Sequence, residues 1–435
     1  MPQDLDWLLS PISSRTFFES YFEKKPLHVR DRPLGFYESV FAPADLRAAI
    51  YQSEELIRRN VKTSGMFSDD PHRSSPGLNA TTAVASWIRA TLAGGESLLI
   101  WDFGHAWLPL GRLVRQVEAV LLNHIEASLV LSPANAIGFP IHFDTYDTMI
   151  LQIAGEKDWN VYRASVDLPV HTQNHRVNGG DLGKPLLRVK LRPGDLLYMP
   201  RGFIHETSTN ETESIHITLI SAPYCWADLL HHLVDEIAET EIALRKHVPL
   251  GAIREIASGG VLNDGVGADL ARALRQFVDR AGLVAPVTRH LERFIDSLIP
   301  IGADLAPLQL AGEIDEKQRI AKKEGMICQV HDDGNRVVIR FPGGHLRGPA
   351  TTRSALRFIA SAVEPFRIAD LPGSLSQRSK GVLVHRLLRE GLLEPVRDQR
   401  SATQMRRTTP SRGQNGDLGA RALKDGRFTE QRPHR

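Results

Sequence analysis

The chain has 435 residues, of which 42% are hydrophobic and 24% are charged, a composition close to that of ordinary globular proteins with roughly two to four domains. The 53 basic and 51 acidic residues nearly cancel, so the overall charge points to no particular partner. The two cysteines, Cys225 and Cys328, exclude a disulfide framework and a cysteine-based zinc finger. No apolar run reaches the ~18 residues of a membrane span, and no secretory leader is evident, so we expect a cytoplasmic protein.

Residues 1–96 are expected to form helices and loops that flank the domain after them. Ser14 is followed by the aromatic side chains of Phe17, Tyr21 and Phe22 at helical spacing, and Pro26 ends the pattern. Such a stripe is typical of an amphipathic helix that covers a core. Residues 97–224 change to short β-rich runs separated by turns, among them ASLVLS, DTMILQI and SIHITLIS. This spacing predicts an antiparallel barrel or sandwich.

Three further regions follow the β-rich one. Residues 225–305 have helical periodicity, with a stripe formed by Leu229, Leu230, Leu233 and Ile237. We expect this stripe to pair with a second copy of the chain, although it could instead pack on its own barrel or on the winged-helix-like module. Residues 306–397 combine a strand (336–341) with compact helices and predict a winged-helix-like module. Residues 398–435 are basic and poor in apolar residues, which predicts a disordered tail that is solvated or touches RNA.

The segment Pro140-Ile141-His142-Phe143-Asp144 opens one of the β-rich runs. Residues two apart in a strand project from the same face, so His142 and Asp144 are predicted to reach the same ion. Alone, this pattern is weak evidence, because the chain contains 17 histidines. A surface or capping pair would explain it equally simply.

A second segment, RPGDLLYMPRGFIH at residues 192–205, strengthens the metal interpretation. Pro193-Gly194-Asp195 predicts a tight turn, and Pro200 and Gly202 bend the strand exit ahead of His205. The spacing resembles that of the cupin barrel family, in which the turn closes a hairpin and the last histidine faces the barrel mouth. His142, Asp144 and His205 would then form the two-histidine, one-carboxylate triad of non-haem Fe(II) oxygenases.

Lys157 lies at the start of the strand after His142, where a surface lysine in a hairpin would be the ordinary interpretation. However, the run ILQIAGEKDW at residues 150–159 resembles the segment of JmjC oxygenases in which a basic residue holds 2-oxoglutarate. The resemblance implies that Lys157 pairs with the distal carboxylate of this co-substrate. Thr218 is a second candidate hydrogen-bond donor, and His216, on the same face, is predicted to line the barrel.

The run SRTFFESYFEKKPLHV at residues 14–29 and the order of the regions resemble the ribosomal oxygenases, a JmjC subfamily that hydroxylates ribosomal-protein side chains. The resemblance implies a double-stranded β-helix core, a helical dimerisation region and a winged-helix-like domain. Relatives that hydroxylate histidine carry Asn and Tyr where this chain has Ser128 and Val130, and a polar residue where it has Ile220. These departures leave the target side chain open.

Together these features predict an Fe(II)- and 2-oxoglutarate-dependent protein hydroxylase, acting on an arginine or histidine of a ribosomal protein as a homodimer. Other substrates of a JmjC oxygenase, namely methyl-lysine, a biosynthetic peptide or a tRNA base, stay open as alternatives. From a different class, a non-catalytic cupin could serve as a binding or assembly module. The helical pair His231-His232 with Glu236 is expected to be a solvated face rather than a second metal site.

Overall fold

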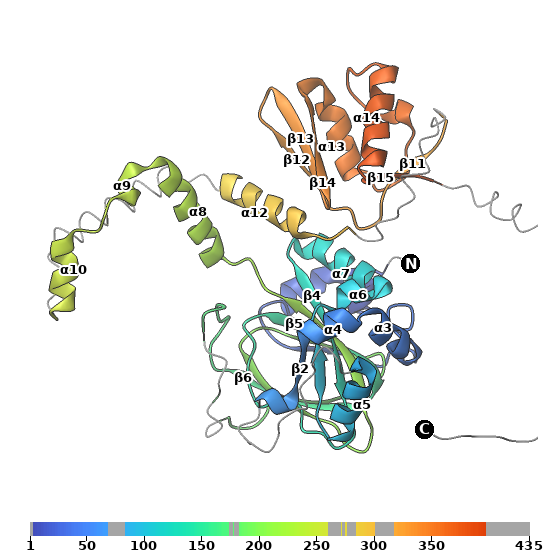
Figure 1. Cartoon of the computed structure of the whole chain (residues 1–435), viewed down its shortest axis with the longest axis vertical. Coiled ribbons are helices and arrows are strands. Elements are labelled where there is room, and N and C mark those ends of the chain that lie inside the picture. The colour runs from blue at the N-terminus through green and yellow to red at the C-terminus, as the bar shows by residue number, and fades with distance from the viewer. Residues whose placement is uncertain are drawn as a thin grey trace, which may run out of the picture.

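The computed structural model describes residues 3–67, 83–173, 177, 182–259, 271, 275, 284–300 and 317–396. Helices and strands are mixed throughout this part of the chain. Figure 1 shows a β-rich body with covering helices, an arm of helices that leaves it, and a small C-terminal unit. The tail predicted at 398–435 lies outside the described residues.

Two antiparallel sheets form the β-rich body. The larger sheet has the strand order β1-β8-β5-β10-β4-β3-β2 and the smaller sheet the order β7-β6-β9. The larger sheet consists of β1 (Leu27–Val29), β2 (Val61–Thr63), β3 (Leu98–Ile100), β4 (Ile125–Ser132), β5 (Asp147–Gly155), β8 (Leu196–Met199) and β10 (Ser214–Ser221). The smaller sheet consists of β6 (Lys157–Ala164), β7 (Leu187–Leu191) and β9 (Phe203–Ser208). The N-terminal region, expected to be helix and loop, thus also contributes the two short strands β1 and β2.

Side-chain alternation gives the larger sheet two different faces. On β10, Ile215, Ile217 and Leu219 belong to the core under the N-terminal helices. His216 and Thr218 point the other way, because alternate residues of a strand project to opposite faces. On that inner side, Ile150 of the larger sheet packs with Trp159 and other apolar residues of the smaller sheet. The space between the sheets is therefore the barrel interior.

Helices cover the outer face of the larger sheet. Phe17, the first aromatic residue of the predicted N-terminal stripe, is fully buried and packs edge-on against Tyr198 of β8 at 4.7 Å between ring centroids. The covering elements are α1 (Leu5–Leu9), α2 (Ser14–Ser20), η1 (Pro43–Asp45), α3 (Leu46–Gln52), α4 (Glu54–Asn60), η2 (Ser64–Phe67), α5 (Val84–Ala93), α6 (Phe103–Ala106) and α7 (Leu108–Leu121). The aromatic stripe thus covers a core, as its spacing predicts.

The turn Pro193-Gly194-Asp195 does not close a hairpin, contrary to the expectation from the cupin resemblance. It carries the chain from β7 in the smaller sheet to β8 in the larger one. Gly194 has a φ of +96°, which favours glycine, and its N–H donates to the Gln152 carbonyl at 2.9 Å. The hairpin prediction is wrong because neighbouring strands in the sequence here belong to different sheets.

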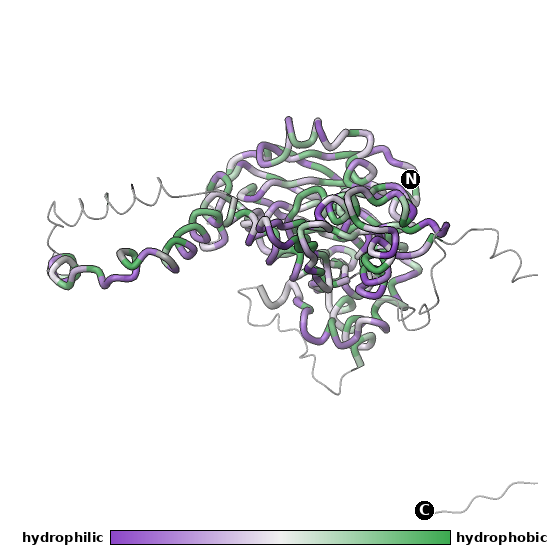
Figure 2. The backbone as a smooth tube through the Cα atoms, turned by 90° about the horizontal axis from the view of Figure 1, so that it is seen from above, coloured by the Kyte–Doolittle hydropathy of each residue, from purple (hydrophilic) through white to green (hydrophobic). Residues whose placement is uncertain are grey.

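The helical arm consists of α8 (Trp226–Thr240), α9 (Ile242–Arg245) and α10 (Leu250–Ala257), and α12 (Val284–Ser297) packs against α8. In Figure 2 the arm projects away from the body of the molecule. Leu229, Leu233 and Ile237 are buried, whereas Leu230 is 50% exposed. The predicted stripe is therefore split between the packed face of α8, which carries the three buried residues, and its open face, which carries Leu230.

The C-terminal unit has its own core. Strand β13 (Arg336–Phe341) coincides with the predicted strand and lies between β12 (Gln329–Asp332) and β14 (Gly344–Pro349). The remaining elements are β11 (Ile320–Lys322), paired with β15 (Leu393–Pro395), and the helices η5 (Ala350–Thr352), α13 (Arg353–Ser361), η6 (Ile368–Asp370) and α14 (Gln377–Arg389). In the described part of the chain, none of the helices is long and apolar enough to span a membrane.

Candidate metal centre and buried lysine

His142 and Asp144 lie on the segment between β4 and β5, outside any regular strand. The expectation that they open a strand is therefore wrong, and a single bridge replaces the strand pairing. His142 pairs with His205 of β9, through hydrogen bonds of 2.8 Å from the His205 N–H and 3.2 Å from the His142 N–H. This bridge still brings both histidines to one place, although the segment is too short to form a ladder.

The structure brings His142, Asp144 and His205 together. Their ligand atoms all lie within 4.8 Å of one another, and the described residues contain no other such cluster of three. Asp144 reaches both histidines, with its carboxylate oxygens 3.6 Å from His142 Nε2 and 3.8 Å from His205 Nε2. Two imidazoles and one carboxylate at these separations could hold a divalent metal ion on one side of the ion, as in non-haem Fe(II) sites.

The ring orientations leave the same nitrogen free on both histidines. His142 Nδ1 lies 2.7 Å from the Pro140 carbonyl, and His205 Nδ1 lies 3.1 Å from the Phe203 carbonyl. A carbonyl accepts only from a protonated Nδ1, which leaves Nε2 as the unprotonated, ligating nitrogen. Burial, followed by the neighbouring His142, lowers the pKa of His205 to about 4. His205 is therefore neutral near pH 7, the form that binds a metal.

Lys157 is the first residue of β6, and its side chain is fully buried. Its Nζ donates to the Ser132 hydroxyl at 2.9 Å, and no carboxylate of the described residues forms an ion pair with it. Burial lowers the pKa of Lys157 to about 7. A buried ammonium without an anion is costly, so the site is suited to a carboxylate ligand.

Two residues that the sequence analysis did not place in a ligand site connect the triad to Lys157. The Trp159 ring lies 5.8 Å from that of His205 and 6.0 Å from that of His216. Burial, and then the charge of Lys157, lowers the pKa of His216 well below its usual value. Trp159 Nε1 and His216 Nδ1 are buried without a hydrogen-bond partner. These orphaned polar atoms are an observation that fits a polar co-substrate between the triad and Lys157.

Thr218 is on the inner face of β10, in register with Ser128 of β4 and Ile150 of β5. One step nearer the end of β10, Ile220 is flanked by Glu126 and Thr148. Thr148 Oγ1 is also buried without a partner. The alternation in DTMILQI could have identified this residue, since it places Thr148, Ile150 and Gln152 on one face.

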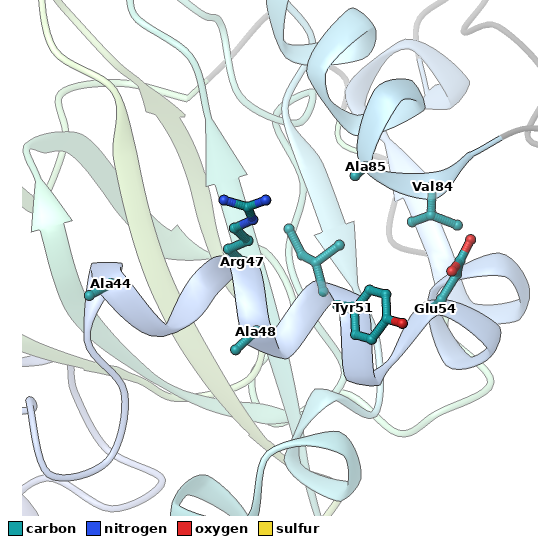
Figure 3. A pocket seen from close by; sticks show the side chains of 8 residues that line it. Ala44, Arg47, Ala48, Tyr51, Glu54, Val84 and Ala85 are labelled. Atoms are coloured by element: carbon teal, nitrogen blue, oxygen red, sulfur yellow. The ribbon is translucent and has the colours of Figure 1, made fainter. Parts of the chain in front are cut away.

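Two other features are distinct from this centre. His231, His232 and Glu236 lie on α8, and the metal-binding cluster found among the described residues contains none of them. A surface pocket is formed by side chains of α3, α4 and α5, including Arg47, Tyr51 and Val84 (Figure 3). It contains none of the predicted site residues.

Comparison with known proteins shows which family this centre resembles. The JmjC domain model matches residues 106–229, a range that contains the triad, Lys157 and Thr218. The chain is 30% identical to ribosomal oxygenase 2 of Bos taurus over 296 residues, covering 62% of this chain and 59% of the relative. Residues 106–229 thus match a JmjC domain, and this similarity supports one of the ribosomal-oxygenase-like kind.

Two further proteins extend the comparison. The bifunctional lysine-specific demethylase and histidyl-hydroxylase NO66 of Drosophila persimilis is 25% identical over 331 residues, which is 73% of this chain and 47% of the relative. The chain thus spans about half the length of these curated relatives. The ribosomal oxygenase YcfD of Escherichia coli, solved with cobalt and 2-oxoglutarate, matches with a TM-score of 0.50 and 17% identity, covering 88% of this chain and 98% of the other. This likeness shows that the two chains share a fold.

Proposed function

We propose that this chain is an Fe(II)- and 2-oxoglutarate-dependent protein hydroxylase that acts on a ribosomal-protein side chain, an arginine or a histidine. The observation that carries the proposal is the triad together with the buried Lys157, whose charge acts on His216, while Trp159 lies close to both His216 and His205. A dicarboxylate suits this arrangement, because one end could chelate the metal while the other end pairs with the Lys157 ammonium.

In the proposed reaction His142, Asp144 and His205 hold the metal through Nε2 and the carboxylate. Bound Fe(II) and 2-oxoglutarate would supply the activation of dioxygen and the oxidising power. Lys157, in its protonated form, would orient the distal carboxylate, and Trp159 would shield the co-substrate from water. The protein's contribution is thus to bind, orient and exclude competing reactions.

The names of the relatives support a substrate among ribosomal proteins, and one of them also names a lysine demethylase. A loss of a methyl group from methyl-lysine would therefore be the alternative outcome of the same chemistry. A non-catalytic cupin is not favoured by the intact triad or by the buried Lys157.

The proposal includes the arrangement of the whole chain. We propose boundaries that give an N-terminal region (1–96), a JmjC core (97–224), a helical region (225–305), a winged-helix-like domain (306–397) and a basic tail (398–435). We also propose that the helical region forms a homodimer. Trp226, Leu230 and Val234 support this, because they recur at every fourth residue of α8 and are 73%, 50% and 47% exposed.

Two experiments test the function. Purified protein with Fe(II), ascorbate and 2-oxoglutarate should release succinate, and the His205→Ala variant should not. Intact masses of ribosomal proteins from parent and deletion strains should then differ by one oxygen atom in the target. No succinate from the metal-loaded parent, with or without ribosomal proteins, would contradict the proposal. A target that differs by methyl groups instead would identify a demethylase.

A further inference from the structure

The turn between β8 and β9 lies against the segment that carries Asp144. The Arg201 N–H donates to Asp147 Oδ1 at 2.8 Å, and the Arg201 guanidinium lies 3.4 Å from Asp147 Oδ2. Both side chains are buried, at 6% and 3% exposure. Arg201 is four residues before His205, and Asp147 is three residues after Asp144. The pair therefore joins the two segments that bear metal-binding side chains.

The next peptide group adds a second connection between the same segments. The Gly202 N–H donates to the Asp144 carbonyl at 2.8 Å. Gly202 has a φ of +90°, and a Cβ there would lie 2.2 Å from the Val166 carbonyl oxygen, so only glycine fits. On the other side of the triad, the backbone bridge joins His142 to His205. The triad is thus held between a backbone bridge and the Asp147–Arg201 pair.

Arg201 also has an outer partner. Its guanidinium lies 2.6 Å from Glu23 Oε1, and the Glu23 side chain is 35% exposed. Burial raises the pKa of Asp147 to about 6, and its contacts with Arg201 oppose that rise. A buried ion pair is often no more stabilising than an apolar pair of similar volume. What distinguishes the Asp147–Arg201 pair is therefore that its directional hydrogen bonds fix how the two segments are arranged.

We propose that Asp147 and Arg201 are positioning residues of the metal centre, which fix the separation of Asp144 from His205 and thereby set the metal affinity. This inference rests on the proposed function, because it takes the triad as the metal site. Residues that orient metal ligands typically change metal affinity by roughly 10- to 100-fold when they are substituted. We expect an effect of this size from the loss of either side chain.

The test is a titration of the metal-free full chain with Co²⁺, followed by visible absorption, with thermal unfolding monitored by circular dichroism. Asp147→Ala and Arg201→Met should weaken Co²⁺ binding about 10- to 100-fold and change the absorption bands. Glu23→Gln, which removes only the outer partner of Arg201, is the matched control and should bind Co²⁺ like the parent.

A double variant, Asp147→Leu/Arg201→Met, carries no uncompensated buried charge and guards against unfolding of the single variants. It should fold and still bind Co²⁺ weakly. Folded variants with the parent affinity and the parent absorption bands would show that the pair is only structural, and the inference would be wrong. If the parent itself failed to bind Co²⁺, the proposed function would fail instead.

Discussion

The side chains of the triad are oriented by groups that lie close to them. His142 and His205 are oriented by carbonyls two residues earlier, and Asp144 is 15% exposed and lies between the two rings. Of the three side chains, only the carboxylate supplies a negative charge toward a divalent ion. Removing it leaves two neutral ligands, which cannot compensate for the dehydration of the ion.

Asp144→Ala should therefore abolish stoichiometric metal binding and succinate release, with the fold retained because Asp144 lies outside the regular strands. Metal content by mass spectrometry and succinate by nuclear magnetic resonance would check this. Asp167→Ala, which changes an exposed carboxylate, is the control. Unchanged iron content and decarboxylation in Asp144→Ala would exclude the triad as the metal site.

The Lys157 side chain is fully buried, and its pKa lies near neutral pH. Because burial lowers its pKa to about 7, the ammonium loses its proton as the pH rises above 7, whereas an exposed lysine would keep it. A carboxylate binds the protonated form. The affinity for 2-oxoglutarate should therefore be constant below pH 7 and fall by about tenfold per pH unit above it.

Calorimetric titrations with 2-oxoglutarate in buffers of different ionisation enthalpy would detect the proton taken up above pH 7. Lys157→Met should lose this pH dependence and bind 2-oxoglutarate about 3–5 kcal/mol more weakly, the usual effect of breaking a buried pair. Parent-like binding by Lys157→Met would place the anchor elsewhere, with Thr218 as the next candidate.

At the scale of elements, α8 has one packed face and one open face. Leu233 and Ile237 form a small core, whereas Trp226, Leu230 and Val234 face outward. Burial of an apolar stripe on a projecting arm favours association with a second copy, and closed two-fold dimers are the commonest solution.

The double variant Leu230→Glu/Val234→Glu should convert a dimer into a monomer without loss of helix, because both side chains are exposed on the arm. Light scattering at micromolar concentration would measure the mass. Glu239→Ala, a polar change on the same helix, is the control. If the parent already has the mass of a single chain, the dimer is excluded.

At the scale of the molecule, Arg115 of α7 connects the JmjC body with the C-terminal part of the chain. Its buried guanidinium pairs with Glu118 at 2.9 Å and donates to the Ile299 carbonyl at 2.7 Å. Ile299 precedes the C-terminal unit and follows α12. One buried charge network therefore spans two parts of the chain that are far apart in the sequence.

Arg115→Met should remove the buried cation beside Glu118, to which only His124 and the Ile125 N–H would remain as partners, and lower the free energy of unfolding by about 3 kcal/mol. Urea unfolding would measure the loss. Arg112→Met, an exposed change on the same helix, should have little effect. Equal stability of the two variants would show that the contact with Ile299 contributes nothing.

The alternating strands, the triad residues and the position of Lys157 could be predicted from the amino-acid sequence, because strand periodicity and short ligand spacings are local properties of the chain. Local patterns do not report which sheet a strand joins or which side of a helix finds a neighbour. The turn at Gly194 therefore changes sheets, and Leu233 is covered by its own chain. Two features join residues from different strands and turns. They are the ring contacts of Trp159 with His205 and His216, and the Asp147–Arg201 pair. Only tertiary packing, which desolvates these groups together, could place them beside the metal centre.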